Sequence, residues 1–281
     1  MNSGLSDDLV ILGSTSYMAE RVLSGIGSPQ RVLAASGIHD TQDASAIVDA
    51  LKDELVNRPA KAVVNFVGAR TASQYVMNLV NVEFPYQVAS ASLAFGTHFV
   101  HFGSAAEITH PIQQLPAGQQ AWRDEYGSSK SQGTTRLLEL PNVTVLRVYN
   151  LRGLPHQEGS GLHRLCRGIR NLFAQTTEVA SPLVNTVRDY VHLNQVSRML
   201  VETIDDSPRG LVEVCSGVGV SIEEIVDSLP AKISEGLKPS LVAPDRFGPV
   251  IGRASAVELG EENRESILRE IREEVLACAF S

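Results

Sequence analysis

Cysteine is scarce in this sequence. The 281 residues include three cysteines, Cys166, Cys215 and Cys278, whose spacing fits no metal-ligand pattern and which cannot all pair with one another. This argues against a fold held by disulfides and against a cysteine-based metal site, so we predict no metal. Free thiols are typical of a reducing compartment, and we expect a cytoplasmic protein.

Long apolar runs and excess positive charge are also missing. No run reaches membrane-spanning length, and residues 1–8 are polar and acidic, so we expect neither a membrane span nor a signal peptide. The net charge of −8 disfavours a broad basic surface for nucleic acid or an anionic membrane. Only five of the 24 basic residues are lysine, so arginine carries most of the positive charge. Any anionic ligand must be held by local cations and backbone N–H groups.

What the sequence does contain is an alternation of apolar strands and helices. Its length allows one large or two small domains, and its 43% hydrophobic and 20% charged residues are typical of a globular protein. The alternation predicts a parallel sheet wound with helices on both faces, a Rossmann-type α/β fold. Strands are expected at 8–12, 30–36, 61–68, 97–102 and 142–149, and helices to about 25, over 44–55, over 72–96 and from 126.

The alternation loosens after Gly153. We therefore place a dinucleotide-binding domain at 1–153 and a smaller, mainly substrate-binding α/β portion at 154–281, with late strands and helices returning to the first domain. A strand at 187–193, a helix at 195–204, a strand at 211–216 and a helix at 261–280 are expected there. Ser221 begins a capping box before a further helix.

The first strand leads into a turn that suits a phosphate group. Gly13 follows the strand and a helix begins shortly after it, so backbone N–H groups and the helix dipole can face a pyrophosphate. The second strand ends at Ser36 without the acid that binds the ribose hydroxyl of NAD, which favours NADP(H), with NAD(H) as the alternative. Asp43 follows soon after, and we expect it to cap the helix over 44–55 rather than to bind a cofactor.

Tyr126 and Lys130 form the most informative pair in the chain. On a helix, residues four apart lie on one face, so the phenol and the ammonium can point into the same cavity. A neighbouring cation lowers the pKa of a phenol, and such a tyrosine can exchange a proton near neutral pH. A pair at this spacing is expected by chance roughly 0.1 times in this chain. The alternative is an ordinary exposed pair on a helix.

Gly68 ends one predicted central strand, and Ser104 follows the next. Open α/β sheets bind ligands at the carboxyl ends of their strands, so both positions are site candidates. The alternative for Ser104 is a serine that caps a turn or helix. His98, His101 and His192 lie in or beside strands, and we interpret them as core or cap histidines rather than ligands.

Taken in order, these segments resemble the extended short-chain dehydrogenase/reductase superfamily, of the NAD-dependent epimerase/dehydratase type that acts on nucleotide sugars. The short gap after the second strand makes the chain similar to the smaller members, the 4-ketoreductases of deoxysugars of the dTDP-4-dehydrorhamnose reductase type. The resemblance runs from about residue 9 to the tail. The matching segments are 65–69, 81–82, 102–106, 126–130, 146–153, 187–192 and 216–221.

The resemblance implies a role for each matched position. Ser104 would hydrogen-bond the substrate oxygen, Tyr126 would transfer the proton, and Lys130 would bind the nicotinamide ribose and lower the tyrosine pKa. Arg188 would clamp the diphosphate of a sugar nucleotide, with Asn150 and Ala105 also on the substrate side. Helices 72–96 and 126 onward commonly pair in this superfamily, so a homodimer is expected. The implied cofactor contacts are Gly13, Thr15, Ser16, Tyr17, Met18, Ser36, Phe66, Val67, Gly68, Asn81, Tyr126 and Lys130.

Some family features are absent from the sequence. The Gly-x-x-Gly-x-x-Gly turn is reduced to Gly13, Ser16 and Ala19, and Asn194-Gln195 replaces an acidic pair. The Thr-Asp-Glu of the 4,6-dehydratases is also missing, since Ala105 and Ala106 follow Ser104. No cysteine lies near Ser104 as in the GDP-fucose-synthase type. Dehydration and that epimerisation are therefore disfavoured.

The sequence thus predicts an NADP(H)-dependent ketoreductase of the short-chain dehydrogenase/reductase type. The expected substrate is a nucleotide-linked 4-keto-deoxysugar or a related ketone. One alternative is a 4-epimerase that keeps NAD tightly bound through both half-reactions. Another is a non-catalytic dinucleotide-binding regulator, which the reduced glycine turn motivates and the intact Ser104, Tyr126 and Lys130 oppose.

Overall fold

The protein divides into two compact units. A computed structural model describes residues 8–26, 31–35, 37–108, 125–153, 160–174, 182–242, 251–252 and 263–280. The first unit contains Met1–Val148 and Val196–Glu213, and the second contains Tyr149–Gln195 and Val214–Ser281. The substrate-binding role predicted for residues after 153 stays a prediction. No helix in the described ranges is both long and apolar enough to cross a membrane.

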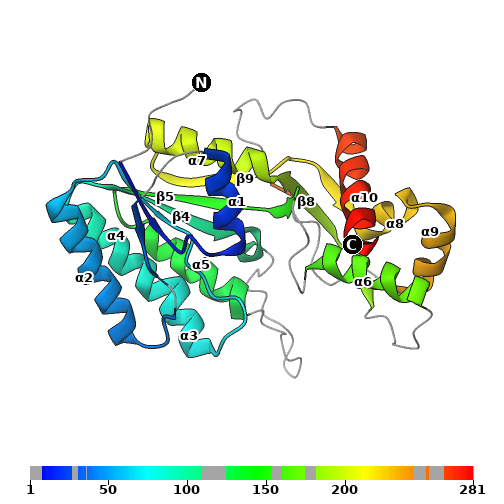
Figure 1. Cartoon of the computed structure of the whole chain (residues 1–281), viewed down its shortest axis with the longest axis horizontal. Helices are drawn as coiled ribbons and strands as arrows, with labels where there is room; N and C mark the ends of the chain where they lie inside the picture. Colours follow the sequence, from blue (N-terminus) through cyan, green and yellow to red (C-terminus); the bar gives the residue numbers. More distant parts are fainter. Residues whose placement is uncertain are drawn as a thin grey trace, which may run out of the picture. The chain divides into compact units, whose positions relative to one another are not determined.

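A six-stranded sheet of order β2-β1-β3-β4-β5-β9 forms the centre of the first unit (Figure 1). The pairs β1–β2, β1–β3, β3–β4 and β4–β5 are all parallel. Parallel neighbours require crossovers, which the intervening helices supply. The predicted Rossmann-type parallel sheet is therefore confirmed. The strands are β1 (Leu9–Leu12), β2 (Arg31–Leu33), β3 (Ala62–Asn65), β4 (His98–Ser104), β5 (Val143–Val148) and β9 (Gly210–Val214).

Helices cover both faces of this sheet (Figure 1). On one face, α1 (Tyr17–Ile26) lies beside α7 (Leu193–Asp206), and Ser197 Oγ donates a hydrogen bond to Val22 O. On the other face, α4 (Phe84–Ala94) packs between α2 (Thr41–Asn57) and α5 (Glu125–Leu137). The sheet is thus doubly wound, as the alternating sequence pattern predicts.

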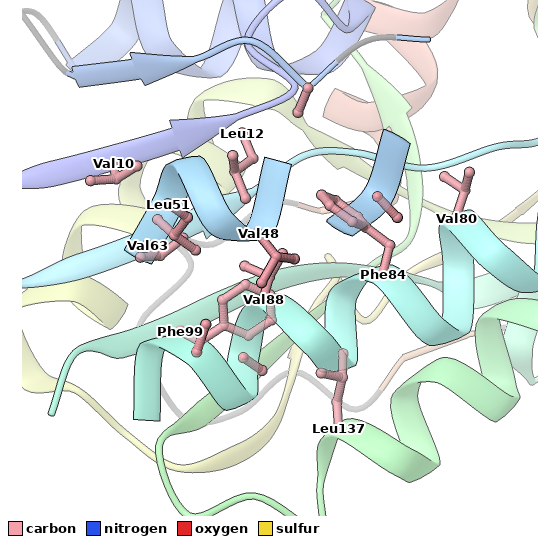
Figure 2. Close-up of a cluster of buried hydrophobic side chains, with 14 of the residues drawn as sticks. Val10, Leu12, Val48, Leu51, Val63, Val80, Phe84, Val88, Phe99 and Leu137 are labelled. Atoms are coloured by element: carbon pink, nitrogen blue, oxygen red, sulfur yellow. The ribbon is translucent and has the colours of Figure 1, made fainter. Parts of the chain in front are cut away.

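The main core of the first unit lies between the sheet and the α2–α4–α5 face (Figure 2). Apolar strands buried on both faces supply one side of it, and the inward faces of the helices supply the other. Phe84 and Phe99 are both fully buried, as is Leu137 from α5. This packing fixes α5 on the sheet and so positions the residues that α5 carries. The labelled members are Val10, Leu12, Val48, Leu51, Val63, Val80, Phe84, Val88, Phe99 and Leu137.

The helix expected over 72–96 is interrupted. It consists of α3 (Gln74–Asn78), a π-helical turn η1 (Leu79–Glu83) and α4. A π-helical turn contains one extra residue, and such turns are frequent at functional sites. Asn81 lies within this turn, fully buried.

The predicted cap of α2 is wrong. The helix begins earlier than expected, and Asp40 caps it by accepting from the N–H groups of Gln42 and Asp43 at 2.8 and 2.9 Å. Asp43 lies in the first turn, where its carboxylate accepts from His39 N at 3.0 Å. Both acids favour the helix N-terminus, so the sequence alone cannot separate the two caps.

The described residues of the second unit form two small sheets. In the first, β8 (Val187–His192) pairs antiparallel with β10 (Gly219–Ser221) and parallel with β6 (Asn150–Arg152). In the second, β7 (Leu183–Val184) pairs parallel with β11 (Leu241–Val242). The predicted capping box at Ser221 is confirmed, because its hydroxyl accepts from Glu224 N while Glu224 accepts from Ser221 N. The helices are α6 (Gly161–Ala174), α8 (Ile222–Ser228), α9 (Ala231–Leu237), η3 (Lys238–Ser240) and α10 (Arg264–Phe280).

The C-terminal helix α10 is an integral part of this unit. One of its faces buries Ile267, Ile271 and Val275 against a core that includes α6. Buried Arg152 forms an ion pair with Glu270 of the same helix. The expected charged amphipathic tail helix is therefore present, and it packs through its apolar stripe.

Candidate active site

A cavity of about 400 Å³ opens at the carboxyl ends of β1, β2 and β3 in the first unit. This is the edge at which open α/β sheets bind ligands. Six of the predicted cofactor residues line it, namely Gly13, Thr15, Ser16, Phe66, Val67 and Gly68. The other lining residues are Ala35, Gly37, Ile38, His39, Ala69, Ala72, Val76 and Val80. Five other predicted cofactor residues are not among them, namely Tyr17, Met18, Asn81, Tyr126 and Lys130, and Ser36 lies outside the described residues.

Only glycine fits at position 13 in the turn after β1. Its φ is +74°, and a Cβ there would lie 2.8 Å from Val67 N. Ser16 N donates to Gly13 O at 3.1 Å, which closes the turn, and Ser16 Oγ accepts from Ala19 N at 3.2 Å. The serine that replaces the second glycine therefore caps α1, and fully buried Ala19 packs the helix against the sheet.

The cavity wall next to β2 carries no acidic side chain among its described lining residues. His39 and Gly37 lie there instead. The nearby Asp43 accepts from His39 N, so its carboxylate is engaged with the backbone. This leaves the wall without the acid that binds an NAD ribose hydroxyl.

Asn81 ties the loop after β3 to α5. Its Oδ1 accepts from Ala69 N at 2.9 Å, and its Nδ2 donates to Ala69 O and to Ser129 Oγ at 2.8 and 2.9 Å. A Cβ at Gly133 of α5 would overlap Asn81 O, so this glycine allows α5 to approach the π-helical turn closely. Asn81 was predicted to bind the cofactor, and here its side chain fixes the loop at Gly68 that lines the cavity.

Lys130 lies behind that loop. A Cβ built on Gly68 would lie 3.6 Å from both Lys130 Nζ and Asn81 Oδ1. The lysine is 5% exposed, and its Nζ donates to Phe102 O at 2.8 Å and lies 3.4 Å from His101 Nε2. Burial lowers the pKa of Lys130 to about 8, against the opposing effect of the Glu107 charge. Half-buried Tyr126 lies one turn earlier on α5, as the spacing predicts.

Ser104 ends β4 and caps the short 3-10 helix η2 (Ala105–Glu107). Its Oγ accepts from Ala106 N at 3.2 Å, which confirms the capping interpretation. Helix α5 packs against both β4 and η2, so Ser104 and the Tyr126–Lys130 helix belong to neighbouring elements. Predicted Ala105 follows in η2 and is buried.

The sequence interpretation missed Glu107. This buried carboxylate accepts from Ser104 N at 2.8 Å and forms an ion pair with Arg147 of β5 at 3.0 Å. It thereby holds the backbone at the end of β4. The signal was present, because a serine followed three residues later by glutamate is the capping-box pattern.

Two of the predicted substrate residues lie in the second unit. Half-buried Arg188 is on β8, where its Nη1 donates to Val187 O at 2.9 Å. Exposed Asn150 is on β6, where its Nδ2 donates to Asp189 O at 3.3 Å. Asn150 therefore lies on the strand next to the one that carries Arg188, with Tyr190 as its register partner.

Asp189, next to Arg188, organises the surrounding backbone. Its fully buried carboxylate accepts from Ser216 N, Ser216 Oγ and Gly217 N at 2.7–2.8 Å and from Gly252 N at 3.2 Å. Burial raises the pKa of Asp189, while these donors lower it.

The interpretation of three histidines as core or cap residues is confirmed. His98 and His101 are buried in β4, and His98 Nε2 lies 2.8 Å from Thr144 Oγ1. His192 Nδ1 accepts from Asn194 N at 3.1 Å beside the start of α7.

Solved structures share this fold, whereas no protein-family model and no curated protein matches the chain. The Bordetella bronchiseptica enzyme WbmG in complex with NAD and UDP is 17% identical, with a TM-score of 0.70 over 98% of this chain and 95% of that one. The dTDP-4-dehydrorhamnose reductase from Bacillus anthracis in complex with NADP is 13% identical, with a TM-score of 0.66 over 99% and 100%.

A third similar structure is that of an epimerase rather than a reductase. The UDP-N-acetylglucosamine 4-epimerase from Methanobrevibacter ruminantium is 12% identical, with a TM-score of 0.67 over 98% of both chains. Structural neighbours thus include nucleotide-sugar enzymes crystallised with NAD or NADP, as the resemblance in the sequence predicts. At these identities the likeness establishes the fold.

Proposed function

We propose that this protein is an NADP(H)-dependent ketoreductase that reduces a keto group, C4 of a nucleotide-linked deoxysugar. The observation that carries the proposal is the meeting of three elements in the first unit. The glycine turn after β1 opens on a cavity, the loop at Gly68 closes one side of it, and Lys130 lies directly behind that loop. Tyr126 lies on the same helix as Lys130, and Ser104 ends the neighbouring strand β4.

The residues present fit a nicotinamide dinucleotide. Position 13 has no room for a side chain, and a Cβ at Gly68, a lining residue of the cavity, would lie 3.6 Å from Lys130 Nζ. Gly13, Thr15 and Ser16 would hold the pyrophosphate at the start of α1. When bound, the reduced cofactor supplies the hydride. The absence of an acid on the wall near His39 favours NADP(H) over NAD(H).

The chain's own residues would donate the proton to the carbonyl oxygen and stabilise the negative charge that develops on it. The Tyr126 hydroxyl would donate its proton to the carbonyl oxygen as negative charge develops on it, and the Ser104 hydroxyl would donate a hydrogen bond to the same oxygen. The Lys130 ammonium would favour the phenolate and so lower the pKa of Tyr126. Glu107 would support Ser104 by holding its backbone N–H.

Two residues of the second unit are the candidates for substrate binding. Arg188 offers a planar fork that suits a diphosphate, and Asn150 lies on the neighbouring strand. The similar WbmG structure contains UDP, which supports a nucleotide-linked substrate. A homodimer stays a prediction from the resemblance.

The replacement Tyr126→Phe tests the reaction. Removing the phenol hydroxyl should lower turnover of a dTDP-4-keto-deoxysugar by roughly 100-fold or more, the usual contribution of a general acid. The dissociation constant of NADPH should stay nearly unchanged, measured by thermal shift or calorimetry. Tyr75→Phe is the control, because Tyr75 is 58% exposed. Retained turnover in Tyr126→Phe would remove the tyrosine from the proposed role.

A 4-epimerase is the second candidate, favoured by the similar 4-epimerase structure. It would use the same three residues but retain NAD through both half-reactions. Protein purified with tightly bound NAD that interconverts sugar epimers without added NADPH would favour this function. If neither activity appears but a dinucleotide binds, the protein is a non-catalytic regulator.

A further inference from the structure

A buried histidine stands between an asparagine and the proposed active-site lysine. Asn65 and His101 are register partners on the parallel strands β3 and β4. Asn65 Nδ2 lies 3.1 Å from His101 Nδ1, and His101 Nε2 lies 3.4 Å from Lys130 Nζ. The three side chains are 0%, 1% and 5% exposed, so water does not replace these contacts.

The backbone decides which way the Asn65 amide points. Val67 N donates to Asn65 Oδ1 at 3.0 Å, and a backbone N–H can only donate. The carbonyl oxygen of the amide is therefore used there, and the NH₂ group faces His101. Since that group donates, His101 Nδ1 must be the bare, accepting nitrogen.

The proton of neutral His101 consequently lies on Nε2. Burial and the Lys130 charge hold the pKa of His101 well below its usual range, so the ring is neutral. The Nε2–H bond is directed at Lys130 Nζ. An ammonium has three donors and no acceptor, so a second donor facing it is unfavourable, whereas a neutral amine can accept this hydrogen bond.

The other groups around Lys130 oppose one another. Phe102 O accepts from Nζ at 2.8 Å, and Glu107 of η2 is the acid whose charge favours the ammonium. Tyr126 lies one turn away on the same helix. In the π-helical turn Asn81 is neutral, and Glu83 forms an ion pair with Arg136 of α5. Among these groups, His101 is therefore the one whose N–H disfavours the protonated form of Lys130.

We propose that Asn65 and His101 act as a positioning pair that fixes the Nε2–H tautomer and weakens the hold of Lys130 on its proton. Under the proposed function, Lys130 then exchanges its proton near neutral pH instead of remaining a permanent cation beside Tyr126. The tautomer and the lysine titration are properties of the protein without ligands. They can be measured whether or not the proposed reaction is correct.

The first measurement reads the tautomer in the wild-type protein. A long-range ¹H–¹⁵N spectrum at pH 7 distinguishes a protonated from a bare ring nitrogen for each of the seven histidines. We expect a bare Nδ1 and a protonated Nε2 for His101. The opposite tautomer, or a charged ring, would overturn the proposal. This measurement stands alone if a variant fails to fold.

The second measurement follows Lys130 in lysine-labelled protein, in which five lysines give five side-chain signals. His101→Phe keeps a buried ring of similar size but removes the N–H. The pKa of Lys130 should therefore rise from about 8 by roughly one pH unit. His98→Phe is the matched control, because this buried histidine of β4 bonds to Thr144.

The direction in which the pKa of Lys130 changes in His101→Phe tests the proposed pair. A rise confined to this variant supports the pair. An unchanged pKa, or a fall, which would mean that Nε2 accepts from the ammonium, contradicts it. If the expected rise appears while Tyr126→Phe retains turnover, the tuning is real and the proposed function is wrong.

Discussion

Polar groups are buried and bonded to the backbone in the first unit, whereas the predicted substrate residues of the second are exposed or half-buried. Asn65, Asn81 and Lys130 are each at most 5% exposed, and each bonds to a main-chain group at the end of a central strand or on the loop that follows. Buried polar side chains are costly unless satisfied, and a satisfied network is rigid. The proposed cofactor side would therefore be assembled before any ligand binds.

In the second unit, a buried carboxylate lies next to the more exposed residues that are predicted to bind substrate. Asp189 is fully buried, and it holds the backbone at Ser216 and Gly217, while neighbouring Arg188 is half-buried and Asn150 exposed. A rigid anchor beside more accessible side chains suits recognition of a variable ligand. Under the proposed function, the chemistry would rest on the first unit and the substrate specificity on the second. Replacements in the two units should accordingly change different quantities.

The largest effect is expected for Lys130→Met. Losing the ammonium should lower turnover by roughly 100-fold or more. Burial lowers the pKa of Lys130 from 10.5 to about 8, so at neutral pH the fold must hold a disfavoured charge. Removing it should raise the free energy of unfolding at pH 7 by roughly 2–3 kcal/mol. Urea unfolding and a turnover assay measure the two changes.

The difference in free energy of unfolding between Lys130→Met and the wild type should depend on pH. Between pH 8 and 10.5 the unfolded wild type binds a proton that the folded protein has released. The free energy of unfolding of the wild type should rise through this window, and the advantage of Lys130→Met should disappear by its upper end. Lys61→Met is the control, since Lys61 forms an exposed ion pair with Asp205. A variant less stable than the wild type at pH 7 would contradict the buried-charge argument.

A smaller effect, confined to substrate affinity, is expected for Arg188→Met. Loss of a bidentate contact to phosphate should raise the KM for the nucleotide sugar by roughly 10- to 100-fold. The turnover number and the dissociation constant of NADPH should change little. Arg198→Met serves as control, because Arg198 pairs with Glu202 on the surface of α7. A fall in kcat by the same factor as the rise in KM would show that Arg188 affects the reaction step as well as substrate affinity.

Strand positions and the parallel sheet could be predicted because buried strands appear as short apolar runs with small or polar residues after them. The interruption of the helix over 72–96 could not, since one extra residue in a turn leaves the apolar pattern almost unchanged. Glu107 was missed although its capping-box spacing was readable. His101 could be predicted as buried, but its tautomer depends on the register of β3 with β4, which the sequence does not contain.

The smallest effect is expected at a departure from the glycine pattern of the family that the sequence resembles. Ser16 replaces a glycine, and its hydroxyl caps α1 by accepting from Ala19 N. Glycine at a helix N-cap costs only a few tenths of a kcal/mol relative to serine, so Ser16→Gly should lower the free energy of unfolding by roughly that amount. The dissociation constant of NADPH, measured by calorimetry, should stay within about threefold, because the turn depends on Gly13 and its positive φ.

Gly13→Ala is the contrasting variant, since its Cβ would meet Val67 N. Much tighter NADPH binding by Ser16→Gly would instead mean that the serine obstructs the pyrophosphate, and the cofactor side would not be fully assembled in this chain.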